Sequence, residues 1–174
     1  QEVAVDMFLH HLQWTGDLEL AKKMFDDTKG VLDWEERILD PDNDGLYQNF
    51  LNTWISDGHS YNGAGCAQAS AYNYLANLIM SKIAEKAGYS SKVFQDRTDK
   101  ILKAMKDKLW IPSKGLIAEH IDTIGNKLVH PSPELSTIYL TIDCGVVDMF
   151  EAYQMLRFTE SDLRNTRTIN RNGR

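Results

Sequence analysis

The chain contains little cysteine, no excess of basic residues and no long apolar run. Two cysteines in 174 residues are too few for a disulfide framework or a cysteine-based zinc site. Neither Cys66 nor Cys144 lies in a nucleophile motif, so both are predicted to be small buried hydrophobic residues. No segment approaches the roughly 18 uninterrupted apolar residues of a membrane span. The first residues also lack the basic and apolar regions of a signal peptide. We therefore expect no membrane partner.

Acidic residues outnumber basic ones, 25 to 19, which gives a formal net charge of −6. This balance offers no electrostatic footprint for nucleic acid, so we expect no nucleic-acid partner. The exception is the arginine-bearing stretch 161–174, which is predicted to be a polar basic tail or linker rather than a nucleic-acid arm. The length of the chain favours one compact domain. We place that domain at residues 1–160.

Apolar periodicity predicts helices over residues 2–14, 18–38, 64–87, 91–110 and 133–158. The third is rich in alanine and apolar on several faces, as expected of an inner helix, and Gly88 should end it. The fourth has one apolar stripe and one charged face, as expected of an outer helix. Residues 113–131 resemble a loop, and no strand alternation is evident. The predicted fold class is all-α, with helical hairpins in two layers.

The stretch 40–75 combines turn chemistry with a group of rings and polar tips. Its opening, DPDNDG at 40–45, is typical of a tight turn, because these residues bond their own backbone or tolerate positive φ. It also resembles the start of a calcium loop, but the twelfth position holds Leu51 where an EF-hand needs a bidentate Glu. We therefore predict a turn, with no metal ion and no cofactor.

A sugar-binding cleft is one interpretation of the residues that follow. Aromatic platforms, a carboxylate and polar side chains gather on a segment loosened by glycines, namely at Trp54, Asp57, His59, Tyr61 and Asn62. The alternative is an ordinary interhelical loop, in which Asp57 is a turn or capping carboxylate. Both interpretations stay open at this level.

Two longer stretches resemble a known family. TGDLELAKKMFDDTKGVLDWEERILDPDNDGLYQNFLNTWISD resembles the repeating hairpin of six-hairpin (α/α)6-toroid glycoside hydrolases, and AEHIDTIGNKLVHPSPELSTIYLTIDCG resembles secreted toroid proteins of polysaccharide-degrading bacteria. The resemblance implies part of such a toroid, a carbohydrate partner, and a periplasmic or secreted location. A complete toroid has more helices than this chain supplies. We therefore expect a fragment whose cut edges expose apolar surface and self-associate.

Glycoside hydrolysis uses two carboxyl groups that face one bond, one as acid and one as base or nucleophile. The candidate acid is Asp57, whose pKa nearby aromatic rings would raise, and the candidate base is Glu119. The candidate sugar-binding residues are Trp54, His59, Tyr61, Asn62, His120 and Asp122. For Glu119 and Asp122 the alternative is a solvated loop ion pair. The alternative function is a non-catalytic domain that binds glycans or scaffolds a larger protein.

Overall fold

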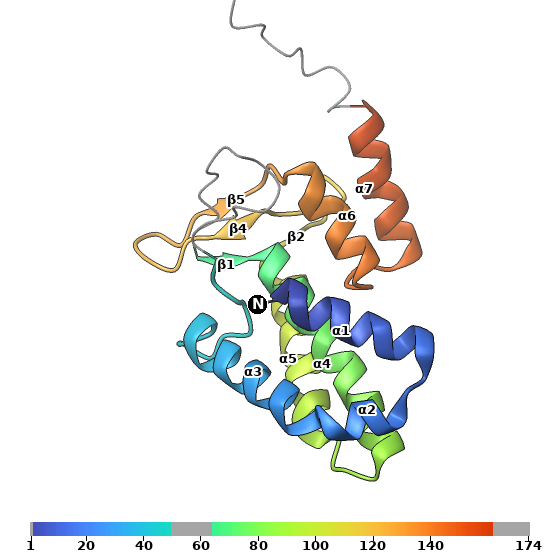
Figure 1. The fold of residues 1–174 in the computed structure, drawn as a ribbon. Helices are drawn as coiled ribbons and strands as arrows, with labels where there is room; N and C mark the ends of the chain where they lie inside the picture. Colours follow the sequence, from blue (N-terminus) through green and yellow to red (C-terminus); the bar gives the residue numbers. More distant parts are fainter. Residues whose placement is uncertain (1, 50–63, 162–174) are drawn as a thin grey trace, which may run out of the picture.

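The computed structural model describes residues 2–49 and 64–161, and the predicted all-α class is confirmed there (Figure 1). The helices are α1 (Glu2–Thr15), α2 (Leu18–Lys23), α3 (Phe25–Leu39), α4 (Ala67–Ala87), α5 (Lys92–Lys108), α6 (Leu135–Asp143) and α7 (Met149–Ser161). In Figure 1, α1–α5 occupy the lower part of the view, while α6 and α7 lie above them beside short strands. None of the described helices is both long and apolar enough to cross a bilayer.

Helix α4 is the central element, as its composition predicted. It packs most extensively against α5 and also contacts α1, α2 and α6. Alanine side chains such as Ala69 and Ala71 are fully buried, which lets neighbouring helices approach closely. The Cys66 sulfur accepts the Ala69 N–H and caps the first turn. The left-handed Gly88 ends the helix at the predicted residue.

Helix α5 buries the predicted stripe and ties α3 to the bundle. Phe94, Ile101 and Met105 are completely buried. Arg97, also on the buried side, donates from Nε to Glu36 at 2.8 Å and from a terminal nitrogen to Asp33 at 2.6 Å. The stripe thus combines apolar packing with an ion-pair network that joins two helices.

Two predicted helices are each broken in two. The prediction for 18–38 missed a break at Met24, after which Phe25 packs its ring against Phe94 and Tyr89. Gly30, inside α3, is helical although glycine weakens a helix by about 1 kcal/mol relative to alanine. The prediction for 133–158 missed the break at Gly145, whose φ of +73° leaves the helical region.

A capping box restarts the chain as α7. Asp148 accepts the N–H of Glu151 at 2.9 Å, and Glu151 reaches back to the Asp148 N–H at 2.7 Å. The pattern Asp-x-x-Glu is a readable start signal. The apolar residues on both sides of this signal continue the helical period and so obscure the break.

Five two-residue strands, which no alternation in the sequence indicated, are present among the described residues. The first sheet joins β1 (Gly65–Cys66), β4 (His120–Ile121) and β5 (Val129–His130) in the order β1-β4-β5, and the second pairs β2 (Trp110–Ile111) with β3 (Leu116–Ile117). All pairings are antiparallel. Two residues are too short for alternation to be visible, so only the tertiary pairing reveals them.

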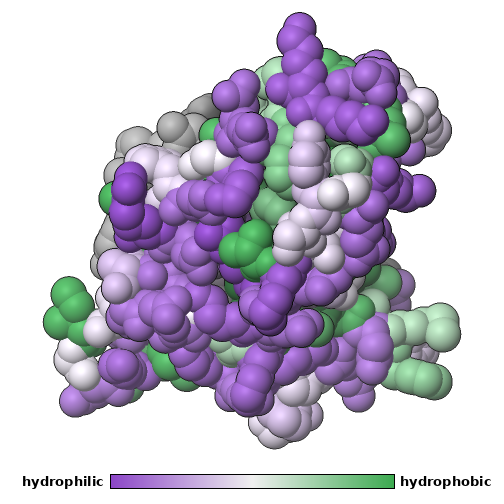
Figure 2. Space-filling view, turned by 90° about the horizontal axis from the view of Figure 1, so that it is seen from below, coloured by the Kyte–Doolittle hydropathy of each residue, from purple (hydrophilic) through white to green (hydrophobic). Residues whose placement is uncertain are grey.

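Two apolar clusters form the core. One lies among α1–α5 and includes Leu9, Leu32 and Met80. The other lies beneath the strands and includes Leu116 and Ile138. Figure 2 views the molecule from below and shows a largely hydrophilic face with hydrophobic residues in separate places.

Candidate functional site

The two loop regions named from the sequence meet at one end of the bundle. The N–H of Ala67 donates to the Glu119 carbonyl at 2.9 Å, and Gly65 lies opposite Ile121 in the sheet. Gln48 forms a β-bridge with Gly65. The residues that follow position 63 therefore adjoin the strand that carries His120, and Gln48 lies on the other side of β1. Five predicted site residues lie outside the described residues: Trp54, Asp57, His59, Tyr61 and Asn62.

Glu119 is buried, with 5% of its surface exposed, and both carboxylate oxygens accept hydrogen bonds. Oε1 accepts from the Thr137 hydroxyl at 2.8 Å, and Gln68 Nε2 lies 3.4 Å from the same oxygen. Oε2 accepts the backbone N–H of Glu134 at 2.8 Å. Glu119 thus connects the start of α4, β4 and the start of α6. Gln68 and Thr137 were not singled out from the sequence, because polar residues inside helices carry no local signal.

Burial raises the pKa of the Glu119 carboxyl and the Glu134 carboxylate adds to the rise, while the bonds from Thr137 and the Glu134 backbone oppose it. A raised pKa brings the carboxyl nearer to the operating pH, which helps a general base as well as a general acid. The sequence-based prediction assigned Glu119 the role of base. The role of Glu119 remains a prediction.

His120, Asp122 and His130 form a compact group on the same sheet, called here the hairpin triad. The rings of His120 and His130 stack with centroids 4.0 Å apart and planes 19° apart. Asp122 Oδ1 lies 3.0 Å from His130 Nε2 and 4.0 Å from His120 Nε2. His120 is 6% exposed, whereas nearly half of the His130 side chain is open to solvent. His130 is not among the site residues predicted from the sequence, because its ten-residue separation from His120 hides the pairing of the strands.

The Asp-rich turn is held by protein groups. The Asp40 carboxylate accepts the backbone N–H groups of Asp44 and Gly45 and pairs with Lys100 Nζ at 2.9 Å. Asp44 pairs with Lys108 Nζ at 2.7 Å. These contacts agree with the predicted tight turn.

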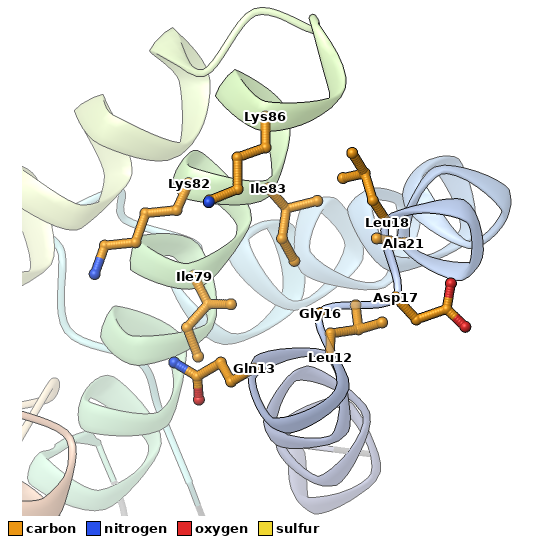
Figure 3. A pocket seen from close by; sticks show the side chains of 10 residues that line it. All are labelled: Leu12, Gln13, Gly16, Asp17, Leu18, Ala21, Ile79, Lys82, Ile83 and Lys86. Carbon is orange, nitrogen blue, oxygen red and sulfur yellow. The ribbon is translucent and has the colours of Figure 1, made fainter.

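A groove with about 470 Å³ of accessible space lies elsewhere, between the α1–α2 corner and α4 (Figure 3). Leu12, Ile79 and Ile83 supply apolar walls, and Lys82 and Lys86 stand at its side. Its acidic residue, Asp17, is occupied in capping α2 by accepting the Leu20 N–H at 2.9 Å. Among the described residues that line this groove, none is aromatic and no second carboxylate is present. It therefore lacks the chemistry of a glycosidase cleft.

The fold is similar to two solved glycoside hydrolases. It aligns with a GH78 family rhamnosidase of Bacillus sp. GL1 at 15% identity and a TM-score of 0.67, over 88% of this chain and 16% of that chain. It also aligns with a rhamnosidase from Klebsiella oxytoca with rhamnose bound, at 15% identity and a TM-score of 0.66, over 95% of this chain and 30% of that chain. No family model and no curated protein matches the sequence. The chain spans less than a third of either neighbour, and the likeness shows a glycoside hydrolase-like fold.

Proposed function

We propose that the chain is part of a glycoside hydrolase-like (α/α) toroid domain that binds a carbohydrate where β1 and β4 meet. The observation that carries this proposal is the fold similarity to two rhamnosidases over most of the chain. The meeting of the two loop regions supports it, since Gln48, Gly65 and His120 belong to neighbouring strands and bridges. A sugar cleft requires such convergence, because its rings and acids come from separate loops.

The proposed reaction is acid/base hydrolysis of a polysaccharide or oligosaccharide, with Asp57 as acid and Glu119 as base. The inverting form needs the two carboxyl groups roughly 6.5–9.5 Å apart, with a water between them. For Glu119 to act on that water, one of its oxygens must accept a hydrogen bond from the water. A carboxylate oxygen can accept two hydrogen bonds, and among the described residues Oε2 accepts that of the Glu134 N–H, so Oε2 retains capacity for the water.

Sugar contacts are proposed for Trp54, Tyr61, His59, Asn62, His120 and Asp122. Rings of this kind stack on the apolar faces of sugars, while amide, imidazole and carboxylate groups bond to hydroxyls. Of the two that the structure describes, Asp122 has the greater exposure, and His120 lies largely covered beneath His130. Asp122 is thus the better placed to touch a ligand directly.

The test measures hydrolysis and binding separately on the whole chain. Reducing-sugar release is followed on a panel of poly- and oligosaccharides that includes rhamnose-containing glycans. Asp57→Asn and Glu119→Gln keep the shape of each side chain while removing its charge, and Asp42→Asn, in the exposed part of the turn, is the matched control. We expect release by the unmodified chain and by Asp42→Asn, with strong loss in the other two.

Calorimetric titration with the same glycans distinguishes the alternatives. Binding without release, unchanged by Asp57→Asn, would favour the non-catalytic glycan-binding domain. Neither binding nor release by a folded chain would leave a scaffolding role and overturn the carbohydrate proposal. Circular dichroism of each variant establishes that a loss of release is not a loss of fold.

The proposed toroid would also account for the apolar surface of α7. Met149, Phe150 and Tyr153 are 79%, 77% and 63% exposed, which is unusual for three large side chains on one helix. In a larger toroid a neighbouring hairpin would cover them. Alone, the chain is proposed to self-associate through this edge, and sedimentation would detect oligomers that Phe150→Glu disperses. The periplasmic or secreted location is likewise a proposal, which fractionation of the source cells would test.

A further inference from the structure

The hairpin triad places three metal-ligand atoms within reach of one another. One ring nitrogen from each of His120 and His130 and one Asp122 oxygen all lie within 4.8 Å of each other. The antiparallel pairing of β4 with β5 creates this arrangement, because it sets the two histidines opposite each other in register. Asp122 follows directly after β4, and its N–H bonds the Leu128 carbonyl at 2.9 Å. The backbone therefore fixes all three positions.

We propose that His120, Asp122 and His130 bind a divalent transition-metal ion of the zinc class. Imidazole nitrogens and one carboxylate suit zinc, and three protein ligands leave a fourth position for water. This proposal shares His120 and Asp122 with the proposed sugar contacts, but it requires neither Asp57 nor a sugar. It also departs from the sequence-based expectation of no metal ion, which considered only the Asp-rich turn and the cysteines.

The distances and the ring orientations must change when an ion binds. Tetrahedral zinc with bonds near 2.1 Å places its ligand atoms about 3.4 Å apart. The Asp122–His130 distance of 3.0 Å is slightly shorter than this spacing, and His120 Nε2 is 4.0 Å from the same carboxylate oxygen. The stacked rings must also tilt so that their nitrogens point at one ion. The exposed ring of His130 has the space to pivot, while His120 stays fixed by burial.

Charge at the site favours an added cation. Within the described ranges, Asp122 has no lysine or arginine ion-pair partner, and its neighbours are the two imidazoles. Imidazole binds a metal ion in its neutral form, so the ion competes with protons at the site. The bound ion would fasten β5 to β4 directly beside Glu119.

The test is calorimetric titration of the chelator-treated chain with zinc chloride, with magnesium chloride as the control ion. We expect one equivalent of zinc to bind, and magnesium not to bind at the same site. His130→Gln and Asp122→Asn should weaken zinc binding roughly 10–100-fold or more, the range already seen for loss of outer-shell partners. His11→Gln removes an exposed histidine on α1 and should leave the affinity unchanged.

Two further readouts separate this site from adventitious binding. Zinc should shift the imidazole NMR signals of His120 and His130 and leave that of His11 in place. Binding should also weaken as the pH falls through the imidazole range, because protons displace the ion. Failure of the folded, unmodified chain to bind zinc would overturn the proposal. So would equal zinc affinity in His130→Gln, Asp122→Asn and the unmodified chain.

Discussion

Among the described residues, two groups have the composition of a metal site, and they differ in what surrounds them. The turn at Asp40, Asp42 and Asp44 and the hairpin triad each bring three ligand-type atoms within 4.8 Å of one another. In the turn, Lys100 and Lys108 supply the positive charge, and backbone N–H groups occupy the Asp40 oxygens. In the hairpin triad, the described neighbours of Asp122 that could carry charge are imidazoles.

Ligand-type residues that lie close together in sequence are therefore weak evidence for a metal site. Stronger evidence is a carboxylate that has no lysine or arginine beside it among the described residues. The Asp-rich turn has the stronger local pattern, yet two of its acids, Asp40 and Asp44, pair with lysines of α5. The triad has no local pattern, because β-pairing assembles it from residues ten apart. Three predictions test this difference between the turn and the hairpin triad.

The largest effect is expected at the buried acid of the turn. Asp40→Ala should lower the free energy of unfolding by about 3 kcal/mol, since it leaves Lys100 short of a partner and two N–H groups unpaired. Asp42→Ala, at an exposed position of the same turn, should change it by less than about 0.5 kcal/mol. Urea unfolding measures both. Equal effects would mean that the turn is not organised around the Asp40 carboxylate.

A smaller loss is expected from the glycine that closes the turn. Gly45 has a φ of +86°, and an added Cβ would lie 2.9 Å from both the Lys100 carbonyl oxygen and the Ala104 side chain. Gly45→Ala should therefore cost about 2–3 kcal/mol in unfolding free energy. Gly30→Ala has open space inside α3 and should instead stabilise by about 0.5–1 kcal/mol. In thermal unfolding, the midpoint temperature should fall for Gly45→Ala and rise for Gly30→Ala.

The same contrast explains which elements could be predicted from the sequence alone. The apolar periodicity and the capping residues predicted α1, α4 and α5, because the information for a helix lies within its own span. The break at Met24 was missed because it depends on where Phe25 packs, against rings far along the chain. The break at Gly145 was readable from Asp148 and Glu151, but the apolar residues around it obscured that signal.

The site was less predictable than the fold. Glu119 was named as a loop carboxylate, and its loop does meet the start of α4, but its burial and its bonds to Thr137 depend on α6. His130 received little weight because nothing local connects it with His120. The candidate residues at 54–62 lie outside the described residues, so their predicted roles stay predictions.

The smallest effect is expected in the pH dependence of stability, where the two groups should act with opposite sign. Burial raises the pKa of the Asp40 carboxyl, despite Lys100 and two backbone N–H groups, and lowers the pKa of His120. For Asp40 the folded chain holds the extra proton, so its contribution is present below the unfolded pKa of about 3.9 and is lost as the pH rises through the folded value. For His120 the unfolded chain holds the extra proton. Its contribution is therefore present above about pH 6.5 and is lost as the pH falls through the folded value.

The contributions of Asp40 and His120 can be separated by measuring the unfolding free energy from acid to neutral pH. The measurement is made on the unmodified chain, His120→Gln and Asp40→Asn. Relative to the unmodified chain, His120→Gln should flatten the decline below about pH 6.5, because glutamine does not titrate. Asp40→Asn should alter the slope only in the carboxylate range and leave the imidazole range unchanged. If His120→Gln leaves the unfolding free energy around pH 6 unchanged, burial does not lower the pKa of His120. The turn and the hairpin triad would then not differ in their response to pH. If the decline disappears, the triad carries a proton-sensitive contact between β4 and β5 that the lysine-paired turn lacks.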